Sequence, residues 1–175
     1  MSNAQDLGFV QQATASGLAE VTEGQIAVAK SVNPAVRSFG QQMVTDHTAA
    51  NNQLRTIAAQ EHIPQSPVLT APEQQEKCSA PDFTGTYVDM QLVDHIQTLR
   101  QFLQETKAGQ DPALVTFAQQ QVPTLMQHLD NAAALDLALR GLPPTPATIN
   151  ASYRVWPRTC REAVRRLRPL RALRR

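Results

Sequence analysis

NPAVRSFGQQMVTDHTAANNQL, residues 33–54, carries both a helix start and a long amphipathic pattern. Asn33 is a good N-cap residue, and Pro34 suits the first helical position because its missing N–H needs no partner there. Steps of four and three residues then place small and apolar side chains on one face, and His47 falls on the same face. The face comprises Val36, Gly40, Met43, His47, Ala50, Leu54 and Ile57. The stretch therefore predicts a long helix that directs one histidine into its own core.

The same start recurs further along the chain. DPALVTFAQQQV (111–122) matches NPAVRSFGQQMV (33–44) without a gap, at an offset of 78 residues. An internal repeat of this kind predicts two similar helical hairpins. The four predicted helices span residues 6–31, 34–61, 82–108 and 112–140, and a proline-rich connection spans residues 62–81.

The length of that connection bears on the topology. A helix of 26 residues is about 39 Å long, and a 20-residue segment can extend to about 66 Å. The connection can thus run the length of the bundle. We predict an all-α fold, a ferritin-like four-helix bundle (residues 6–141) in up-down-down-up order with one long crossover. A simple up-and-down bundle with a long loop is the alternative.

Charge is distributed unevenly along the 175 residues. Residues 151–175 hold nine arginines and one acid, a net charge of +8, so the remainder carries −7 and the whole chain +1. We treat residues 142–175 as a tail that is first proline-rich and then arginine-rich. An arginine cluster can bind nucleic acid or an anionic membrane through residues 154–175. The alternative is an accidental extension, such as a shifted reading frame produces.

The sequence gives little support for a membrane-spanning protein, a serine hydrolase, a nucleotide-binding protein or a cysteine metal site. It contains no apolar run of membrane-spanning length, no serine–histidine–acid order and no phosphate-binding loop. Cys78 and Cys160 lack metal-ligand spacing and are interpreted as free thiols. No signal peptide is visible, and Ser2-Asn3-Ala4 is a common remnant of tag cleavage, so an export signal removed from the chain is an open alternative. A homodimer also stays open. We expect a binding or stress-related protein rather than an enzyme, and the alternative is a metal-free structural or interaction module of the cell envelope.

Each predicted helix carries one ionisable residue on its apolar face: Glu20, His47, His95 and His128. Their distances from the turns predict that these four residues lie at a similar depth along the bundle. Glu20 lies 13 residues before the turn at Asn33 and His47 lies 14 after it, while His95 and His128 lie 16 before and 17 after Asp111. Antiparallel helices of this length place all four near mid-bundle.

Buried groups of this kind need compensation, because an unpaired buried charge costs several kcal/mol. One solution is a single transition-metal ion (Zn, Fe, Mn or Cu) held by Glu20, His47, His95 and His128. Asp46 and Asp94, each preceding a histidine, would then orient the imidazoles. The other solution is a metal-free network of hydrogen bonds. His62, at the end of its helix, is expected at the surface.

Four segments of the chain resemble a bacterial ferritin-like family of unknown function, whose members are often labelled exported or outer-membrane proteins. The resemblance covers residues 6–140. Its specific pieces are LAE (18–20), the two Asp-His pairs, and PTLMQH (123–128). It implies an up-down-down-up bundle and a periplasmic or secreted location, but no activity. The chain lacks the Glu-x-x-His motif of di-iron bundles, since Val44 and Leu125 stand three residues before His47 and His128. A mononuclear or vestigial site therefore fits better than a di-iron centre.

Overall fold

The computed structural model describes residues 2–65 and 82–152, and all regular structure in these ranges is helical. Four long helices and one short helix follow in chain order: α1 (Ala4–Lys30), α2 (Pro34–Gln60), α4 (Phe83–Ala108), α5 (Pro112–Leu139) and α6 (Pro146–Ser152). The long helices begin and end within two residues of the predicted bounds. Cys78, Cys160, residues 66–81 of the predicted crossover and the arginines of the tail lie outside the described residues.

The repeated start motif builds the same helix start twice. The side-chain oxygen of Asn33 accepts from the backbone N–H groups of Ala35 and Val36, at 2.9 and 3.3 Å. Asp111 does the same for Ala113 and Leu114, at 3.0 and 3.2 Å. Each cap satisfies backbone donors that have no partner within the helix.

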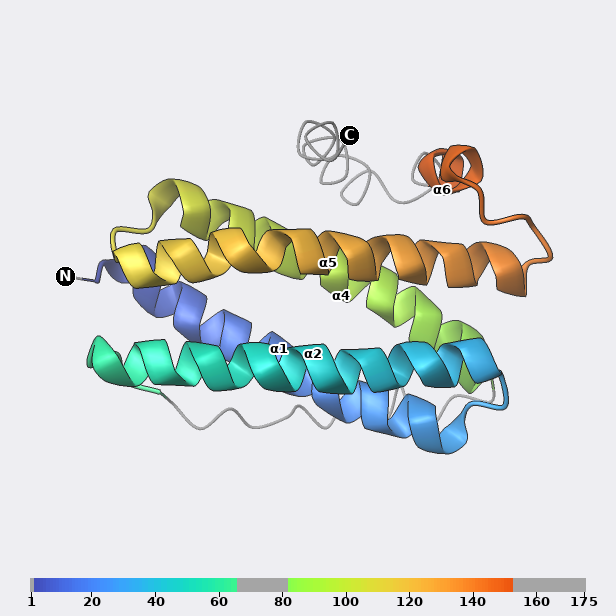
Figure 1. Ribbon diagram of the computed structural model, residues 1–175, viewed down its shortest axis with the longest axis horizontal. Coiled ribbons are helices and arrows are strands. Elements are labelled where there is room, and N and C mark those ends of the chain that lie inside the picture. Colours follow the sequence, from blue (N-terminus) through green and yellow to red (C-terminus); the bar gives the residue numbers. More distant parts are fainter. Residues whose placement is uncertain (1, 66–81, 153–175) are drawn as a thin grey trace.

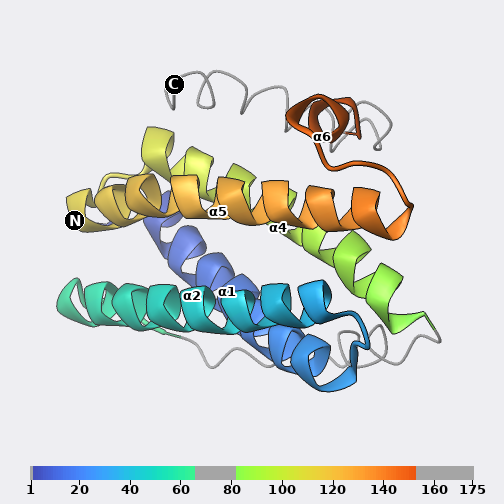
Figure 2. The ribbon, with the colours of Figure 1, turned by 45° about the vertical axis from the view of Figure 1, so that its right-hand side comes forward.

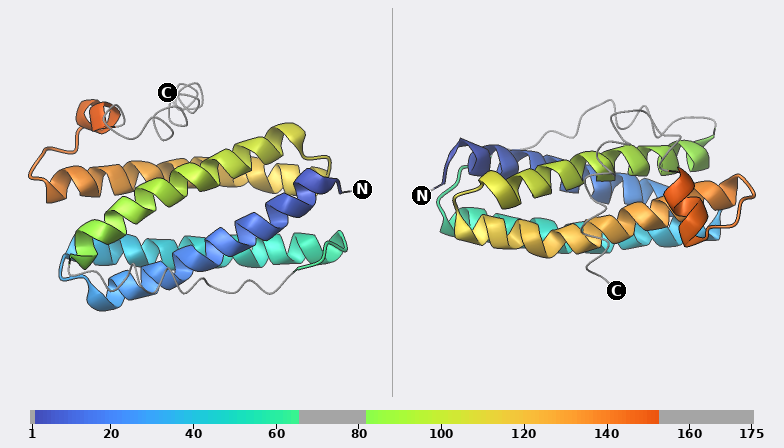
Figure 3. Two further views of the ribbon diagram at one scale, coloured as in Figure 1. Left: turned by 180° about the vertical axis from the view of Figure 1, so that it is seen from behind. Right: turned by 90° about the horizontal axis from the view of Figure 1, so that it is seen from above.

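The four long helices pack in pairs, as in a four-helix bundle. α1 packs along α2 and α4 along α5, while α1–α4 and α2–α5 contacts join the pairs. Figure 1 shows α1 and α5 running in one direction, and α2 and α4 in the other. The end of α2 and the start of α4 consequently lie at opposite ends of the bundle (Figure 1). Viewed from above, α1 and α4 form one layer and α2 and α5 the other (Figure 3).

Two glycines allow α1 and α2 to approach closely. A Cβ atom on Gly24 would lie 2.6 Å from the carbonyl oxygen of Gly40, and one on Gly40 would lie 2.9 Å from that of Gly24. Only hydrogen atoms fit at such backbone distances. This contact fixes the α1–α2 pair a short way from the level of the ionisable residues.

The apolar faces predicted from the sequence form the core, apart from their ends. Phe9, Phe102 and Phe117 cluster towards one end, with ring centroids 4.9 to 6.3 Å apart. Leu139, the last residue of α5, is 40% exposed. Within the described residues, no helix is long and apolar enough to cross a membrane.

The short helix α6 was missed by the sequence analysis, which placed residues 142–152 in a tail. Thr145 and Thr148 cap its start, each hydroxyl accepting from the other residue's N–H at 3.2 and 2.8 Å. Ile149 is partly buried against the core. α6 packs on α5, on the outer side of the bundle (Figure 2). Seven residues are too few for a periodicity signal, and the caps are the only local cue.

Candidate metal centre

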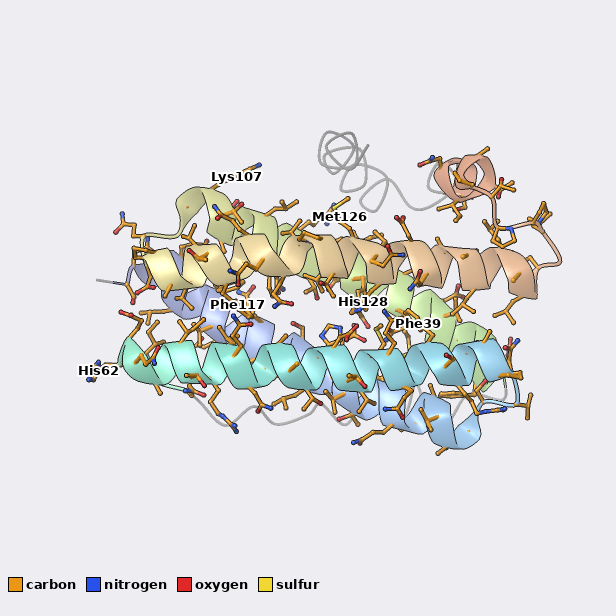
Figure 4. The ribbon with its side chains drawn as sticks, in the orientation of Figure 1. Phe39, His62, Lys107, Phe117, Met126 and His128 are labelled. Atoms are coloured by element: carbon orange, nitrogen blue, oxygen red, sulfur yellow. The ribbon has the colours of Figure 1, made fainter. Side chains whose placement is uncertain are left out.

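Three histidines from three different helices meet inside the bundle. His47 comes from α2, His95 from α4 and His128 from α5, and their exposed fractions are 6%, 0% and 1%. The ring centroids lie 5.3 to 5.5 Å apart. One ring nitrogen from each residue can be chosen so that all three lie within 4.8 Å of one another. Figure 4 shows the labelled His128 pointing from α5 into the space between the helices.

Oxygen atoms around the cluster fix the position of the ring hydrogen in two of these imidazoles. Nδ1 of His95 lies 3.0 Å from the backbone carbonyl oxygen of Gln91. A carbonyl oxygen only accepts, so Nδ1 of His95 carries the hydrogen. Nε2 of His128 lies 2.8 Å from a carboxylate oxygen of Asp46 and donates to it in the same way. In their neutral forms, both rings therefore have a bare second nitrogen.

Those two bare nitrogens face each other. Nε2 of His95 lies 3.3 Å from Nδ1 of His128, a distance that would suit a hydrogen bond. With both rings neutral, however, no hydrogen remains to lie between them, so two lone pairs point at one another. The contact is repulsive unless a proton or a metal ion lies between the nitrogens. A cation between the two nitrogens would remove this repulsion.

His47 offers a third candidate ligand, since one of its ring nitrogens lies within 4.8 Å of a ring nitrogen of each of the other two histidines. Nε2 of His47 is buried and has no hydrogen-bond partner. Unpartnered polar atoms are uncommon in protein interiors, and each one calls for an explanation such as an ion or a water. The His47 nitrogen completes a set of three.

Burial keeps these groups uncharged. It lowers the pKa of His47 to about 3, with a further contribution from the nearby His128. Burial, with His47 and His128 close by, holds the pKa of His95 well below its usual value. It also lowers the pKa of His128, although Asp46 acts in the opposite direction. The neutral imidazole is the form that binds metal ions.

Glu20 lies on the other side of His95 from the three converging nitrogens. One of its carboxyl oxygens is 3.4 Å from Nδ1 of His95, and the other accepts from the side-chain amide of Gln91 at 2.7 Å. Burial, with Glu23 and Asp94 nearby, raises its pKa well above the usual value. Its position is that of a group that orients the His95 ring rather than one that contacts the ion.

The two aspartates predicted to orient imidazoles have different surroundings. Asp46, on α2, contacts His128 of α5 directly. Asp94 instead lines a polar pocket of about 130 Å³ between α1 and α4, together with Glu20 and Glu23. His62 is exposed, as predicted, at the far end of α2 (Figure 4).

The spacing of the nitrogens is close to that of a metal centre. Two nitrogens at the usual zinc distance of about 2.1 Å are about 3.4 Å apart in a tetrahedral site. The His95–His128 distance of 3.3 Å already matches this value. The three ligand nitrogens lie within 4.8 Å of one another, so the longest of their separations exceeds the tetrahedral value by about 1.4 Å at most. The three histidines could therefore hold a metal ion if the rings moved inward by up to about this amount.

Two residues of the site were missed by the sequence analysis. Gln91 is fully buried and donates its side-chain amide to both Glu20 and Glu23, at 2.7 and 3.2 Å. Glu23 is 2% exposed. Gln91 precedes His95 by one helical turn, and Glu23 follows Glu20 by three residues, so both lie close to the predicted inner faces. That spacing was the only signal that could have found them.

Comparison with known families finds one match, to a family of unknown function. Residues 1–135 match the family described as Domain of unknown function (DUF4142). The chain belongs to this family. No curated protein and no solved structure matches the chain. The DUF4142 region includes α1, α2, α4 and most of α5, and therefore all three histidines of the centre.

Proposed function

We propose that this DUF4142 protein binds one transition-metal ion through His47, His95 and His128. The observation that carries the proposal is the pair of bare nitrogens of His95 and His128, facing each other at 3.3 Å. A metal ion between them turns a repulsive contact into two coordinate bonds, and His47 supplies a third.

The donor set narrows the choice of ion. Imidazoles suit Zn²⁺, Cu²⁺ and Fe²⁺, whereas Mn²⁺ prefers carboxylates and other oxygen ligands. Three histidines leave the fourth position of a tetrahedral zinc site open. We therefore rank Zn²⁺ and Cu²⁺ ahead of Fe²⁺, and Mn²⁺ last.

We further propose that the bundle has ferritin-like topology and that the protein acts in the cell envelope, as a binding or stress-related protein. The parallel directions of α2 and α4, and their offset ends, support the topology (Figure 1). The envelope location rests on the family resemblance alone. A mononuclear centre fits the absence of a Glu-x-x-His motif at His47 and His128.

Metal analysis of the purified protein tests the metal proposal. Wild-type protein, incubated with excess Zn²⁺ or Cu²⁺ and then desalted, is expected to retain one ion per chain. The double variant His47→Ala/His95→Ala is expected to retain none. His62→Ala is the matched control, because His62 is an exposed histidine on the same chain. Equal retention by the double variant and wild type contradicts the proposal.

One alternative has support from a specific observation. Hydrogen bonds and close contacts run from Glu20 through Gln91, His95 and His128 to Asp46, and so link all four long helices. Such a network can serve as a metal-free device that specifies the packing of a structural module. In that case the wild-type protein retains no metal, and His95→Ala lowers its stability. A proton between His95 and His128 would then take the place of the ion.

A further inference from the structure

A second feature adjoins the centre: a small cavity between the helices. Its volume is about 20 Å³ and its walls are mainly apolar. His47 and His128 form one side of it. The other walls include Gly17, Ala50, Asn51, Leu54, Thr98 and Leu125. A space of this size holds one water or a molecule of two or three heavy atoms.

The internal repeat explains why the space is there. At the offset of 78 residues, His95 corresponds to Gly17 and His128 to Ala50, while His47 corresponds to Leu125. All three of these counterparts line the cavity. The counterpart of Glu20, Thr98, also lines it. The cavity thus occupies the place related by the repeat to the histidine centre, with small or apolar residues where that centre has polar ones.

Two polar atoms without partners belong to residues in the cavity wall. They are Nε2 of His47 and the side-chain nitrogen Nδ2 of Asn51. His47 and Asn51 lie one turn apart on α2, so both can reach the same side of the bundle. Asn51 fits because residue 17 is glycine: a Cβ there would lie 2.1 Å from its Oδ1 atom. With the His47 nitrogen assigned to the ion, the buried amide donor of Asn51 still lacks a partner, and a small ligand between the ion and Asn51 would supply one.

We infer that this cavity is the site of an exchangeable ligand of the metal. The ligand is a molecule or anion of one to three heavy atoms that donates an electron pair to the ion and accepts a hydrogen bond from Asn51. Water, hydroxide and diatomic molecules belong to this class. The inference rests on the proposed function, since the ion at the three histidines holds the ligand. Asn51 is a positioning residue, and the small volume of the cavity excludes larger molecules.

Cobalt(II) and azide provide the test. Co²⁺ replaces the native ion and reports its coordination by its visible spectrum, and azide is a three-atom ligand. In the Co²⁺-loaded wild-type protein, azide is expected to change the spectrum saturably. Gly17→Ala adds a methyl group where the Asn51 amide now lies, so this amide has to leave its present position. This variant is expected to bind Co²⁺ normally and azide at least tenfold more weakly.

Gly8→Ala is the matched control. Gly8 lies on the same helix, and a Cβ there meets nothing within 4 Å. Its azide affinity should equal that of wild type. Should Gly17→Ala fail to fold, Asn51→Leu replaces the amide by a group of similar size without a donor, and the same tenfold loss is expected.

The outcomes separate the two proposals. Co²⁺ binding without a saturable azide response overturns this inference and leaves the metal proposal intact. The inference is also overturned if Gly17→Ala binds azide with the same affinity as wild type. Where Asn51→Leu replaces that variant, the same comparison applies to it. Absence of Co²⁺ binding by the wild-type protein overturns both.

Discussion

His95 and His128 each donate their ring N–H to an oxygen atom outside the cluster of three imidazoles. The other ring nitrogen of each, which faces into the cluster, therefore carries no hydrogen. The backbone carbonyl of Gln91 accepts the hydrogen bond from His95, and the carboxylate of Asp46 accepts the one from His128. This division of roles, in which an outer partner fixes the tautomer and the inner nitrogen binds the ion, is typical of metal-bound histidines. It requires no metal to be present when the protein folds.

The tautomers can be measured in the metal-free protein. We expect His95 to be the Nδ1–H form and His128 the Nε2–H form, because each donates to a fixed oxygen. Long-range ¹H–¹⁵N correlation spectra of the imidazoles at neutral pH report this directly. A His128 ring protonated on both nitrogens would contradict the prediction and favour the metal-free network.

Sequence patterns located the histidines but not their partners. His47, His95 and His128 could be predicted because helical periodicity gives the face, and distance from a turn gives the depth. The carbonyl of Gln91 and the amide of Asn51 could not, since which atoms meet depends on side-chain rotamers and on the neighbouring helix. Glu20 shows the same limit: the pattern placed it at the right depth but did not tell on which side of His95 it lies.

At the scale of the helices, the close approach of α1 and α2 depends on Gly24 and Gly40. A side chain at either position meets backbone of the facing helix, and backbone cannot move aside as the end of a flexible side chain can. The same helix pair carries Glu20 on α1 and His47 on α2, so this contact also sets the spacing between these two residues.

Gly24→Ala is expected to lower the free energy of unfolding by about 1–3 kcal/mol, the usual cost of overpacking. Gly8→Ala, in open space on the same helix, should instead raise it by up to about 1 kcal/mol, because alanine favours helix. Urea denaturation of the two variants and wild type checks both signs. Equal effects of the two substitutions would contradict the role assigned to the contact.

A group of buried carboxyls joins the start of α1 to the turn between α4 and α5. Asp6 accepts from the backbone N–H groups of Gln110 and Asp111, at 3.0 and 3.3 Å. The side-chain amide of Gln5 donates to Glu105 at 3.1 Å. Burial raises the pKa of Glu105 to about 7, whereas backbone hydrogen bonds from Asn3 and Asp111, followed by the hydrogen bond with Glu105, lower the pKa of Asp6. The protonated form of Glu105 is the form that can donate to the Asp6 carboxylate.

This arrangement predicts a pH dependence of stability. The pKa of Glu105 is higher in the folded than in the unfolded protein, so its contribution is complete below about pH 4.5 and is lost as the pH rises through about 7. The loss is on the order of 2–3 kcal/mol. Glu105→Gln keeps a donor and does not titrate. Relative to this variant, wild type should therefore lose stability between pH 4.5 and pH 8.

Chemical denaturation at the two pH values measures that difference. Glu20 and the histidines titrate in both proteins, so their effects cancel in the comparison. A constant difference between wild type and Glu105→Gln would show that the Glu105 pKa is not raised. Apolar periodicity could not reveal this cluster of carboxyl side chains, because the side chains belong to helix ends that meet only in the folded bundle.

At the scale of the whole molecule, the chain combines a negatively charged bundle with a strongly basic segment. Residues 153–175 carry nine arginines and one glutamate, so their removal changes the net charge from +1 to −7. The fold of the bundle could be predicted from the repeat and its caps. The short helix α6 could not, since its stability comes from its packing on α5 rather than from its own sequence.

Deletion of residues 153–175 tests the basic segment. The full chain is expected to bind heparin at low salt and to release it as salt rises, because the interaction is electrostatic. The shortened chain should not bind, since its net charge repels a polyanion. Retention of the shortened chain under the same conditions would place any anion site on the bundle instead. Circular dichroism serves as the control that the helices are unchanged.

The central claim is that one metal ion lies among three buried imidazoles contributed by α2, α4 and α5. Anomalous diffraction at the zinc absorption edge, from crystals grown with Zn²⁺, tests it most directly. The account predicts a single strong peak about 2.1 Å from Nε2 of His95, Nδ1 of His128 and a ring nitrogen of His47. Crystals in excess Zn²⁺ with no anomalous density among these rings would contradict it.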